Sequence, residues 1–184
     1  MFRYSVVARV LFGCGVLLLA GPVGAEENGL YGLGRLATET EINAWNIDVA
    51  SNGAGLPPGR GTVQQGAVIF ATKCAFCHGP SGTEGPKDRL VGGHGSLATS
   101  QPVKTIGSYW PYATTLYDYI FRAMPFTAPQ SLTSDEVYSL VAWLLHQNGI
   151  IEKDAVLDAR TLPTIRMPNR NGFISDLRSD VPIH

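Results

Sequence analysis

Hydrophobic residues follow helical spacing mainly in the middle of the chain, where the first helix signal is at Thr62. Thr62 and Gln65 have the spacing of a capping box, in which two side chains satisfy free backbone amides at a helix start. The pattern predicts a helix that runs to about Phe76. Gly66 and Phe70 lie four positions apart in it, so the helix presents a flat spot beside an aromatic ring.

A second capping-box pattern, Thr133 with Glu136, predicts a helix closer to the C-terminus. This helix is expected to end near Asn148, because Gly149 is a typical residue just beyond a helix. Its buried stripe is predicted to consist of five apolar residues at helical spacing: Val137, Leu140, Val141, Leu144 and Leu145.

Two further helices are expected. Pro111 suits the first position of a helix over residues 112–123. A short helix fits residues 40–47, and Trp45 within it needs a place to bury its ring. No run predicts a strand of note, and there is no internal repeat. The fold class is therefore all-α, with short helices joined by long loops, and a domain of this kind commonly has a cofactor at its centre.

These patterns divide the chain into four parts. Residues 1–25 are a targeting segment, and residues 26–61 form an arm that packs on the domain. Residues 62–149 form the organised domain, and residues 150–184 form an irregular extension punctuated by proline. The chain is long enough for one modest domain rather than two.

The first 25 residues have the layout of a secretory signal peptide. Arg3 and Arg9 provide a basic start, Val10–Gly21 is apolar, and small residues precede a cleavage site after Ala25. The apolar run is too short to span a bilayer, so no membrane anchor is expected after cleavage. Lipid attachment at Cys14 is the weaker alternative, because Arg9 interrupts the apolar stretch before it. We therefore predict export to the periplasm.

Composition and charge exclude several classes of protein. The formal net charge is −1 and only 16% of the residues are charged, which excludes a basic nucleic-acid binder. Three cysteines are too few for a disulfide scaffold, and a hydrophobic content of 45% excludes a disordered tail. The sequence shows no pair of carboxylates of the kind that would indicate acid–base catalysis. The chemistry must therefore lie in a more specific motif.

That motif is Cys74-Ala-Phe-Cys77-His78, which follows the first predicted helix. Cys-x-x-Cys-His is the attachment signature of c-type haem. At this spacing the two thiols reach two positions on one porphyrin edge, and the next imidazole lies under the iron. His78 is expected to be the proximal ligand through Nε2, with the other ring nitrogen donating to a loop carbonyl near Pro86. The sequence thus predicts one covalent haem c.

Two other interpretations of the motif are weaker. A Cys-x-x-Cys disulfide oxidoreductase needs a βαβ context, which is not visible here. A structural zinc site needs a fourth ligand, and the chain has no second cysteine pair to provide it.

The sixth iron ligand has several candidates. Met124, in Arg-Ala-Met-Pro-Phe, lies in a loop between two helices and can approach the iron face opposite His78. Met167 lies in the extension and must wrap back to compete. His94, in Gly-Gly-His-Gly, and an open site are the remaining alternatives. We therefore predict that Met124 and His78 are the axial ligands.

Other polar and aromatic residues have mainly structural interpretations. Tyr109, Trp110 and Tyr112 could donate to a haem propionate, but core packing is the more common role of such a cluster. Lys104 and Arg122 could balance propionate charge or be solvated. Three acidic residues are expected to serve helix ends or solvent: Asp118, Asp135 and Glu136.

Residues 62–149 resemble a class I cytochrome c, with an N-terminal helix running into Cys-x-x-Cys-His, a Met-Pro loop and a capped C-terminal helix. Nearly all of the chain after the leader resembles the cytochrome subunit of Sox-pathway sulfane (sulfur) dehydrogenase, and related cytochromes serve sulfite dehydrogenases. This resemblance is carried by five segments: Ala44–Val49, Gly55–Gly59, Leu90–Gly93, Pro102–Tyr112 and Met167–Phe173. The family's sulfane dehydrogenase cytochromes are longer and carry two haems, whereas this chain has one Cys-x-x-Cys-His.

The resemblance implies a non-catalytic electron-transfer subunit with a class I cytochrome c fold and irregular terminal extensions. Its expected partners are a molybdenum-cofactor dehydrogenase subunit, which gives electrons, and a second cytochrome, which takes them. The arm and the extension exceed what one haem fold needs, which suggests that they form the interface with the molybdenum subunit. A free diffusible electron shuttle is the main alternative, and a haem sensor or haem enzyme is a weaker one.

Overall fold

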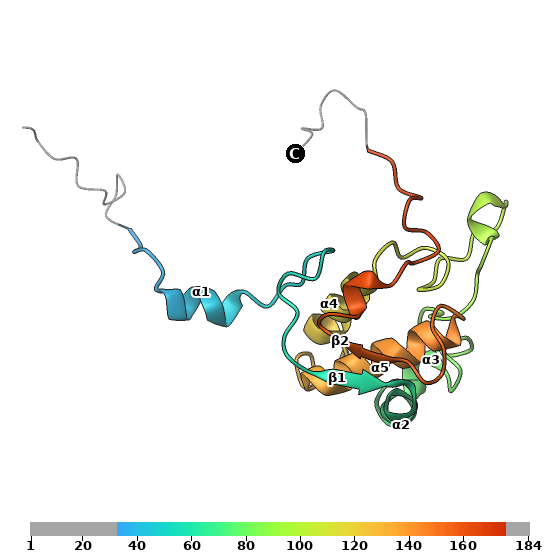
Figure 1. Cartoon of the computed structure of the whole chain (residues 1–184), viewed down its shortest axis with the longest axis horizontal. Helices are drawn as coiled ribbons and strands as arrows, with labels where there is room; N and C mark the ends of the chain where they lie inside the picture. Colours follow the sequence, from blue (N-terminus) through green and yellow to red (C-terminus); the bar gives the residue numbers. More distant parts are fainter. Residues whose placement is uncertain (1–32, 176–184) are drawn as a thin grey trace, which may run out of the picture. The chain divides into compact units, whose positions relative to one another are not determined.

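The computed structural model describes residues 33–175 (Figure 1). The chain divides into two units, residues 1–42 and 43–184, and the boundary falls inside helix α1 (Glu39–Trp45). The predicted signal peptide, its expected cleavage after Ala25 and the alternative at Cys14 all fall outside the described residues. Within the described part of the chain, no helix is long and apolar enough to cross a membrane.

Helix α1 corresponds to the short helix expected over 40–47, shifted by one or two residues. The expectation that Trp45 is buried is wrong, because its side chain is 86% exposed. No residue of α1 is buried. The helix is therefore not held by apolar packing, and its stability must come from local contacts.

The capping box predicted at Thr62 is confirmed at the start of helix α2 (Val63–Lys73). The helix does not continue to Phe76 as expected. Cys74 leaves helical geometry, with φ −124° and ψ −34°, and a separate helical turn, α3 (Ala75–His78), follows it. This change of direction places the cysteine motif on its own turn beyond the end of α2.

Helix α4 (Ala113–Ala123) agrees with the helix expected over 112–123 except at its start. Tyr112 is an extended N-cap residue, so Pro111 is not the first helical position. Met124 is the C-cap residue, and its amide donates to the carbonyl of Ile120 at 3.0 Å.

The second predicted capping box, at Thr133, is confirmed at the start of helix α5 (Ser134–Gln147). Its predicted stripe of five apolar residues is buried. Four neighbours outside the stripe are buried as well: Tyr138, Ser139, Ala142 and Trp143. Because nine consecutive residues are buried, α5 is the central helix of the domain and other elements pack around it.

Helices α2 and α5 pack against each other (Figure 1). A Cβ atom added to Gly66 would lie 1.9 Å from the carbonyl oxygen of Ser139, so no larger residue fits without a shift. Next to this point the rings of Phe70 and Trp143 stack with centroids 4.0 Å apart. The flat spot expected beside Phe70 is therefore the crossing point that fixes α2, and with it the cysteine motif, against α5.

A small antiparallel sheet joins β1 (Arg60–Thr62) to β2 (Val156–Asp158), with Gly61 opposite Leu157. The sequence did not predict these strands, because three residues are too few to show the alternation of a strand. The sheet fastens the C-terminal extension to the start of α2. The fold remains helical, with a small sheet at its edge.

Of the arm expected over residues 26–61, the part formed by residues 47–59 is bonded to the domain. The amide of Val49 donates to Oδ1 of Asp118 in α4 at 2.8 Å. The hydroxyl of Tyr138 in α5 donates to the carbonyl of Pro57 at 2.9 Å. This segment therefore connects two helices of the domain.

The C-terminal extension contributes to the core rather than only lying on it. Leu157, Leu162 and Met167 are at most 2% exposed and join the apolar cluster around α5. Two 3₁₀ turns complete the described elements: η2 (Ser96–Ala98) and η3 (Leu162–Thr164).

Candidate haem site

Cys77 and His78 lie on the helical turn α3, and Cys74 is the N-cap residue of that turn. The amides of Cys77 and His78 both donate to the carbonyl of Cys74 at 3.1 Å. Both cysteines are half-buried and neither forms a disulfide. The backbone thus places the three residues that carry the thiols and the imidazole next to one another on one turn.

The imidazole of His78 is oriented by the loop that follows it. Its Nδ1 lies 2.9 Å from the carbonyl oxygen of Asp88. A carbonyl can only accept, so Nδ1 carries the proton and Nε2 keeps a free lone pair for a metal. The acceptor expected near Pro86 is therefore found two residues further along.

The glycine-rich loop after the motif folds back against it. The amide of Lys87 donates to the carbonyl of Cys77 at 2.9 Å. A Cβ atom added to Gly85 would lie 2.2 Å from that same carbonyl oxygen and 2.3 Å from the carbonyl carbon of His78. The loop therefore needs glycine at position 85 in order to support the proximal side of the site.

The pKa of Cys74 argues against a disulfide oxidoreductase. Burial raises the pKa of the free Cys74 thiol to about 11. A thiol with this pKa stays protonated at neutral pH, whereas catalytic Cys-x-x-Cys sites depend on a thiolate. For the zinc alternative, the described residues contain no group of three or more His, Cys, Asp or Glu side chains placed to bind a metal.

The candidates for the sixth ligand lie in different environments. Met124 is half-buried at the end of α4. Met167 is only 1% exposed and packs in the apolar core. His94 is exposed. Of the three, only Met124 is both located at the end of a helix and half-buried. Met124 therefore stays the predicted ligand.

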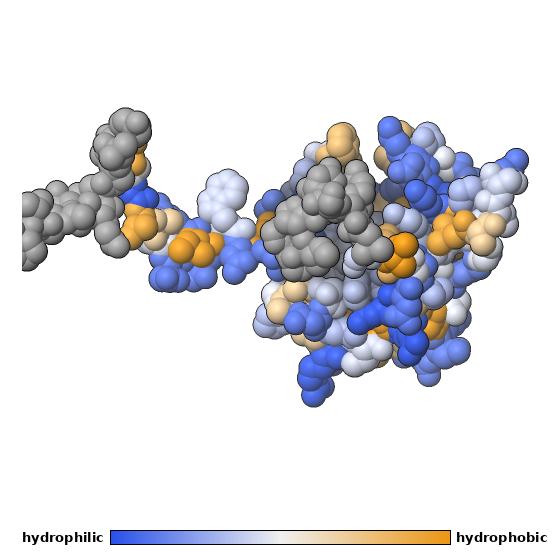
Figure 2. Space-filling model, turned by 90° about the horizontal axis from the view of Figure 1, so that it is seen from above, coloured by the Kyte–Doolittle hydropathy of each residue, from blue (hydrophilic) through white to orange (hydrophobic). Residues whose placement is uncertain are grey.

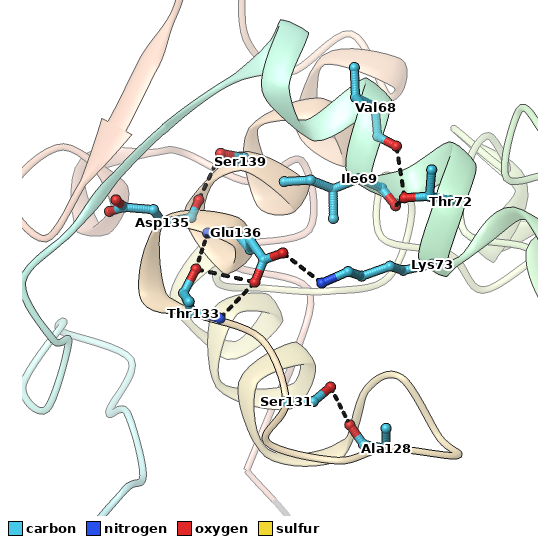
Figure 3. Close-up of polar contacts among 10 residues, drawn as sticks. All are labelled: Val68, Ile69, Thr72, Lys73, Ala128, Ser131, Thr133, Asp135, Glu136 and Ser139. Carbon is cyan, nitrogen blue, oxygen red and sulfur yellow. Dashed lines mark hydrogen bonds and ion pairs between the residues drawn. The ribbon is translucent and has the colours of Figure 1, made fainter.

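An ion pair links the attachment motif to the central helix (Figure 3). Lys73, the last residue of α2, lies 2.6 Å from Glu136 in the first turn of α5. The hydrogen bond with Lys73, followed by the capping amide of Thr133, lowers the pKa of Glu136. Sequence reasoning assigned Glu136 to the helix end but missed Lys73, because partners 63 positions apart share no local pattern.

Asp118 has a role that the sequence did not reveal. It was expected at a helix end or in solvent, but it is buried on α4. One oxygen accepts from the amide of Val49 and the other pairs with Arg122 at 2.5 Å. Arg122 is therefore engaged in holding a loop rather than free for a propionate.

The aromatic residues expected near a propionate have their own partners. Nζ of Lys104 lies 5.0 Å from the ring centre of Tyr109, and the guanidinium of Arg170 lies 4.2 Å from that of Tyr112. Trp110 is half-buried and meets the ring of Tyr119 edge-on. Of the three, Trp110 packs against the apolar core, whereas Tyr109 and Tyr112 each contact a cationic side chain.

The donor set fits haem c. Two half-buried, unpaired thiols stand one turn apart, and the imidazole after them is fixed with Nε2 free. This is the chemistry that covalent attachment and proximal ligation require. The remaining side chains of the motif do not compete, since Phe76 points into solvent at 93% exposure.

Comparisons with known proteins support the same conclusion. Residues 61–144 match the family described as cytochrome C oxidase, cbb3-type, subunit III. A chain from the crystal structure of the sulfane dehydrogenase SoxCD from Paracoccus pantotrophus is 47% identical, with a TM-score of 0.75. The match covers 81% of this chain and 74% of that one. A search of the curated proteins gave no match. The chain therefore belongs to the c-type cytochromes, electron-transfer proteins that hold haem c, and has their class I fold.

Proposed function

We propose that this chain is the electron-accepting cytochrome of a molybdenum-cofactor dehydrogenase that oxidises sulfane sulfur or sulfite in the periplasm. The observation that carries the proposal is the 47% identity to a SoxCD chain over 81% of the sequence. The family match spans less than half of the chain, so the likeness to SoxCD extends well beyond the haem-binding part. A relation of this extent favours a similar place in a complex over a shared haem fold alone.

The residues of this chain have distinct tasks in that role. Cys74 and Cys77 tether a single haem, and His78 is held in the tautomer that binds iron. Haem c, when bound, supplies a one-electron couple, and methionine ligation raises its potential. Met124 is proposed to give that ligation. The protein itself catalyses no bond change and passes electrons on to a second cytochrome.

The surface next to these residues suits contact with a redox partner. Phe76 lies between the two cysteines and Phe126 lies two residues after Met124, and they are 93% and 82% exposed. Exposed aromatic rings beside the haem-binding residues give a partner an apolar surface with little charge to desolvate. We propose that the loops 79–95 and 124–130 form the rim of this contact.

The proposal is tested on tagged protein isolated from its native host. Molybdenum content is measured, and haem reduction is followed after addition of sulfite or thiosulfate. Co-purified molybdenum with substrate-driven reduction is the expected result. Reduction by sulfite alone would identify a sulfite dehydrogenase, and a need for a thiosulfate-loaded carrier protein would identify a sulfane dehydrogenase. A molybdenum-free cytochrome that stays oxidised would contradict the proposal and favour the free shuttle.

Localisation is tested on the same material. We propose that the leader is cleaved after Ala25, so the mature protein should begin at Glu26 and be released with the periplasmic fraction. Intact-mass measurement reads the cleavage site and the number of haems together. A mass that includes the leader or a lipid on Cys14 would contradict this part of the proposal.

A further inference from the structure

Residues 33–45, here called the arm segment, carry several large apolar side chains that are exposed. Leu36 is 91% exposed and Trp45 is 86% exposed, and Leu33 and Ile42 are exposed as well. Ile42 and Trp45 are three positions apart on α1 and so lie on one face of the helix. Figure 2 shows hydrophobic and hydrophilic surface alternating along this segment. Exposed large apolar residues that share one face of a helix, as Ile42 and Trp45 do, are a feature of interaction sites.

The arm segment is ordered by its own polar contacts. Thr38 and Glu41 form a capping box, with the amide of Thr38 donating to Glu41 at 2.9 Å and the amide of Glu41 donating back to Thr38. Arg35 pairs with Glu41 at 2.5 Å, and this contact lowers the pKa of Glu41 to about 2. These local contacts stabilise the helix, and order that exists before binding reduces the entropy lost on binding.

The chain directly after the arm segment is firmly attached. Only residues 46–48 separate Trp45 from Val49, whose amide is bonded to Asp118. Two residues further on, the carbonyl of Ser51 accepts from the hydroxyl of Thr114 at 3.1 Å. A helix with exposed apolar residues thus leads within a few residues into a segment anchored to α4.

The charge of the arm segment distinguishes between a protein and a membrane as its partner. Helices that bind membrane surfaces are rich in Lys and Arg. The arm segment has one basic residue, Arg35, which is already paired, and two acidic residues, Glu39 and Glu41. An anionic lipid surface would repel this helix, so a protein groove is the better fit.

We propose that the arm segment docks its apolar residues, with Trp45 as the anchor, into an apolar groove on the molybdenum-cofactor subunit. This inference rests on the proposed function, and it makes the contact with that subunit permanent rather than transient. The likeness to the SoxCD chain reaches well outside residues 61–144, so it must include part of the terminal segments. A free shuttle would have no use for an uncovered apolar helix.

The test uses the full-length cytochrome, co-expressed with a tagged molybdenum subunit, and measures the dissociation constant of the purified complex. Trp45→Ala is expected to raise this constant at least tenfold, since buried tryptophans dominate interface energies. Val68→Ala is the matched control, because Val68 is an exposed apolar residue on α2. The fluorescence of Trp45, read as the difference between wild type and variant, is expected to shift to the blue on complex formation.

The outcomes separate this inference from the function on which it rests. If the wild type does not bind the molybdenum subunit at all, the proposed function fails. If it binds and Trp45→Ala binds equally well, the docking proposal is overturned and the function stands. Binding of the wild type to anionic vesicles, or a loss of stability of the isolated Trp45→Ala cytochrome, would also overturn it, because the occupant would then be lipid or the chain's own domain.

Discussion

The His78 segment and the Met124 segment each follow a helix of 11 residues, α2 and α4, yet they are held by different contacts. On the His78 side the chain is bonded to residues distant in sequence. The imidazole is bonded to Asp88, ten positions away, and Lys73 is paired with a residue 63 positions away. Gly85 packs directly on the backbone of the motif. This side of the site is therefore fixed by several independent contacts.

The loop after Met124 is held mostly by itself. Within the described chain, the hydrogen bonds of residues 124–132 join positions no more than four apart, such as the hydroxyl of Ser131 with the carbonyl of Ala128 (Figure 3). Residues 126–131 are exposed. His78, the predicted proximal ligand, is thus preorganised, whereas the position of Met124, the predicted distal ligand, depends on the packing of one half-buried side chain. On unfolding, the Met124 segment is thus expected to lose its structure before the His78 segment does.

The largest expected effect comes from comparing Met124→Ala with Met167→Ala. Met124→Ala should leave the haem covalently attached but change the oxidised spectrum and lower the reduction potential, because methionine ligation raises it. Met167→Ala should keep the spectrum and lower the free energy of unfolding by about 2–5 kcal/mol, the cost of emptying a buried site. Visible spectra, potentiometry and denaturant unfolding of both holoproteins measure these effects.

The reverse result would move the ligand to the C-terminal extension. If Met167→Ala changes the spectrum and Met124→Ala does not, the assignment of Met124 is wrong. If neither changes it, the sixth position is open or is taken by His94, and the sensor alternative gains support.

A smaller effect is expected from Gly85→Ala on the proximal side. The φ of Gly85 is not in the left-handed region, so the effect is steric and comes from the contacts with Cys77 and His78. Overpacking of this kind costs about 1–3 kcal/mol. Thr127→Ala in the distal loop is the control and should change stability by less than about 0.5 kcal/mol. Urea unfolding and the yield of haem-containing protein measure both, and equal effects would remove the difference between the two sides.

The sequence predicted what is local in this molecule. Both capping boxes and the stop at Gly149 were correct, since each depends on residues within one or two turns. The break at Cys74 was missed because nothing in the local pattern interrupts the helix before residue 76. The loop carbonyl bonded to His78 was expected within two residues of its position, because the loop is short and must fold back.

Contacts between distant residues could not be predicted. The role of Asp118 depends on a backbone amide 69 positions away, and the Lys73–Glu136 pair on a helix crossing that only the folded chain creates. Trp45 was expected to be buried because an indole ring is costly to expose. The ring of Trp45 is exposed in the isolated chain, as is expected if it packs against another protein.

The smallest expected effect concerns the ion pair that ties the proximal segment to α5. Its side chains are 38% and 26% exposed, so the pair should contribute no more than about 1 kcal/mol. The contact lowers the pKa of Glu136 in the folded state from the ordinary value of 4.5. The contribution is therefore complete above pH 4.5 and is lost as the pH falls through the lowered folded-state pKa. Glu136→Gln should lower the free energy of unfolding at pH 7, and the difference from wild type should shrink on acidification. Glu152→Gln, at an exposed position, is the control and should show no such trend. If the difference in unfolding free energy between wild type and Glu136→Gln stays constant with pH, the charge of Glu136 does not hold the proximal side.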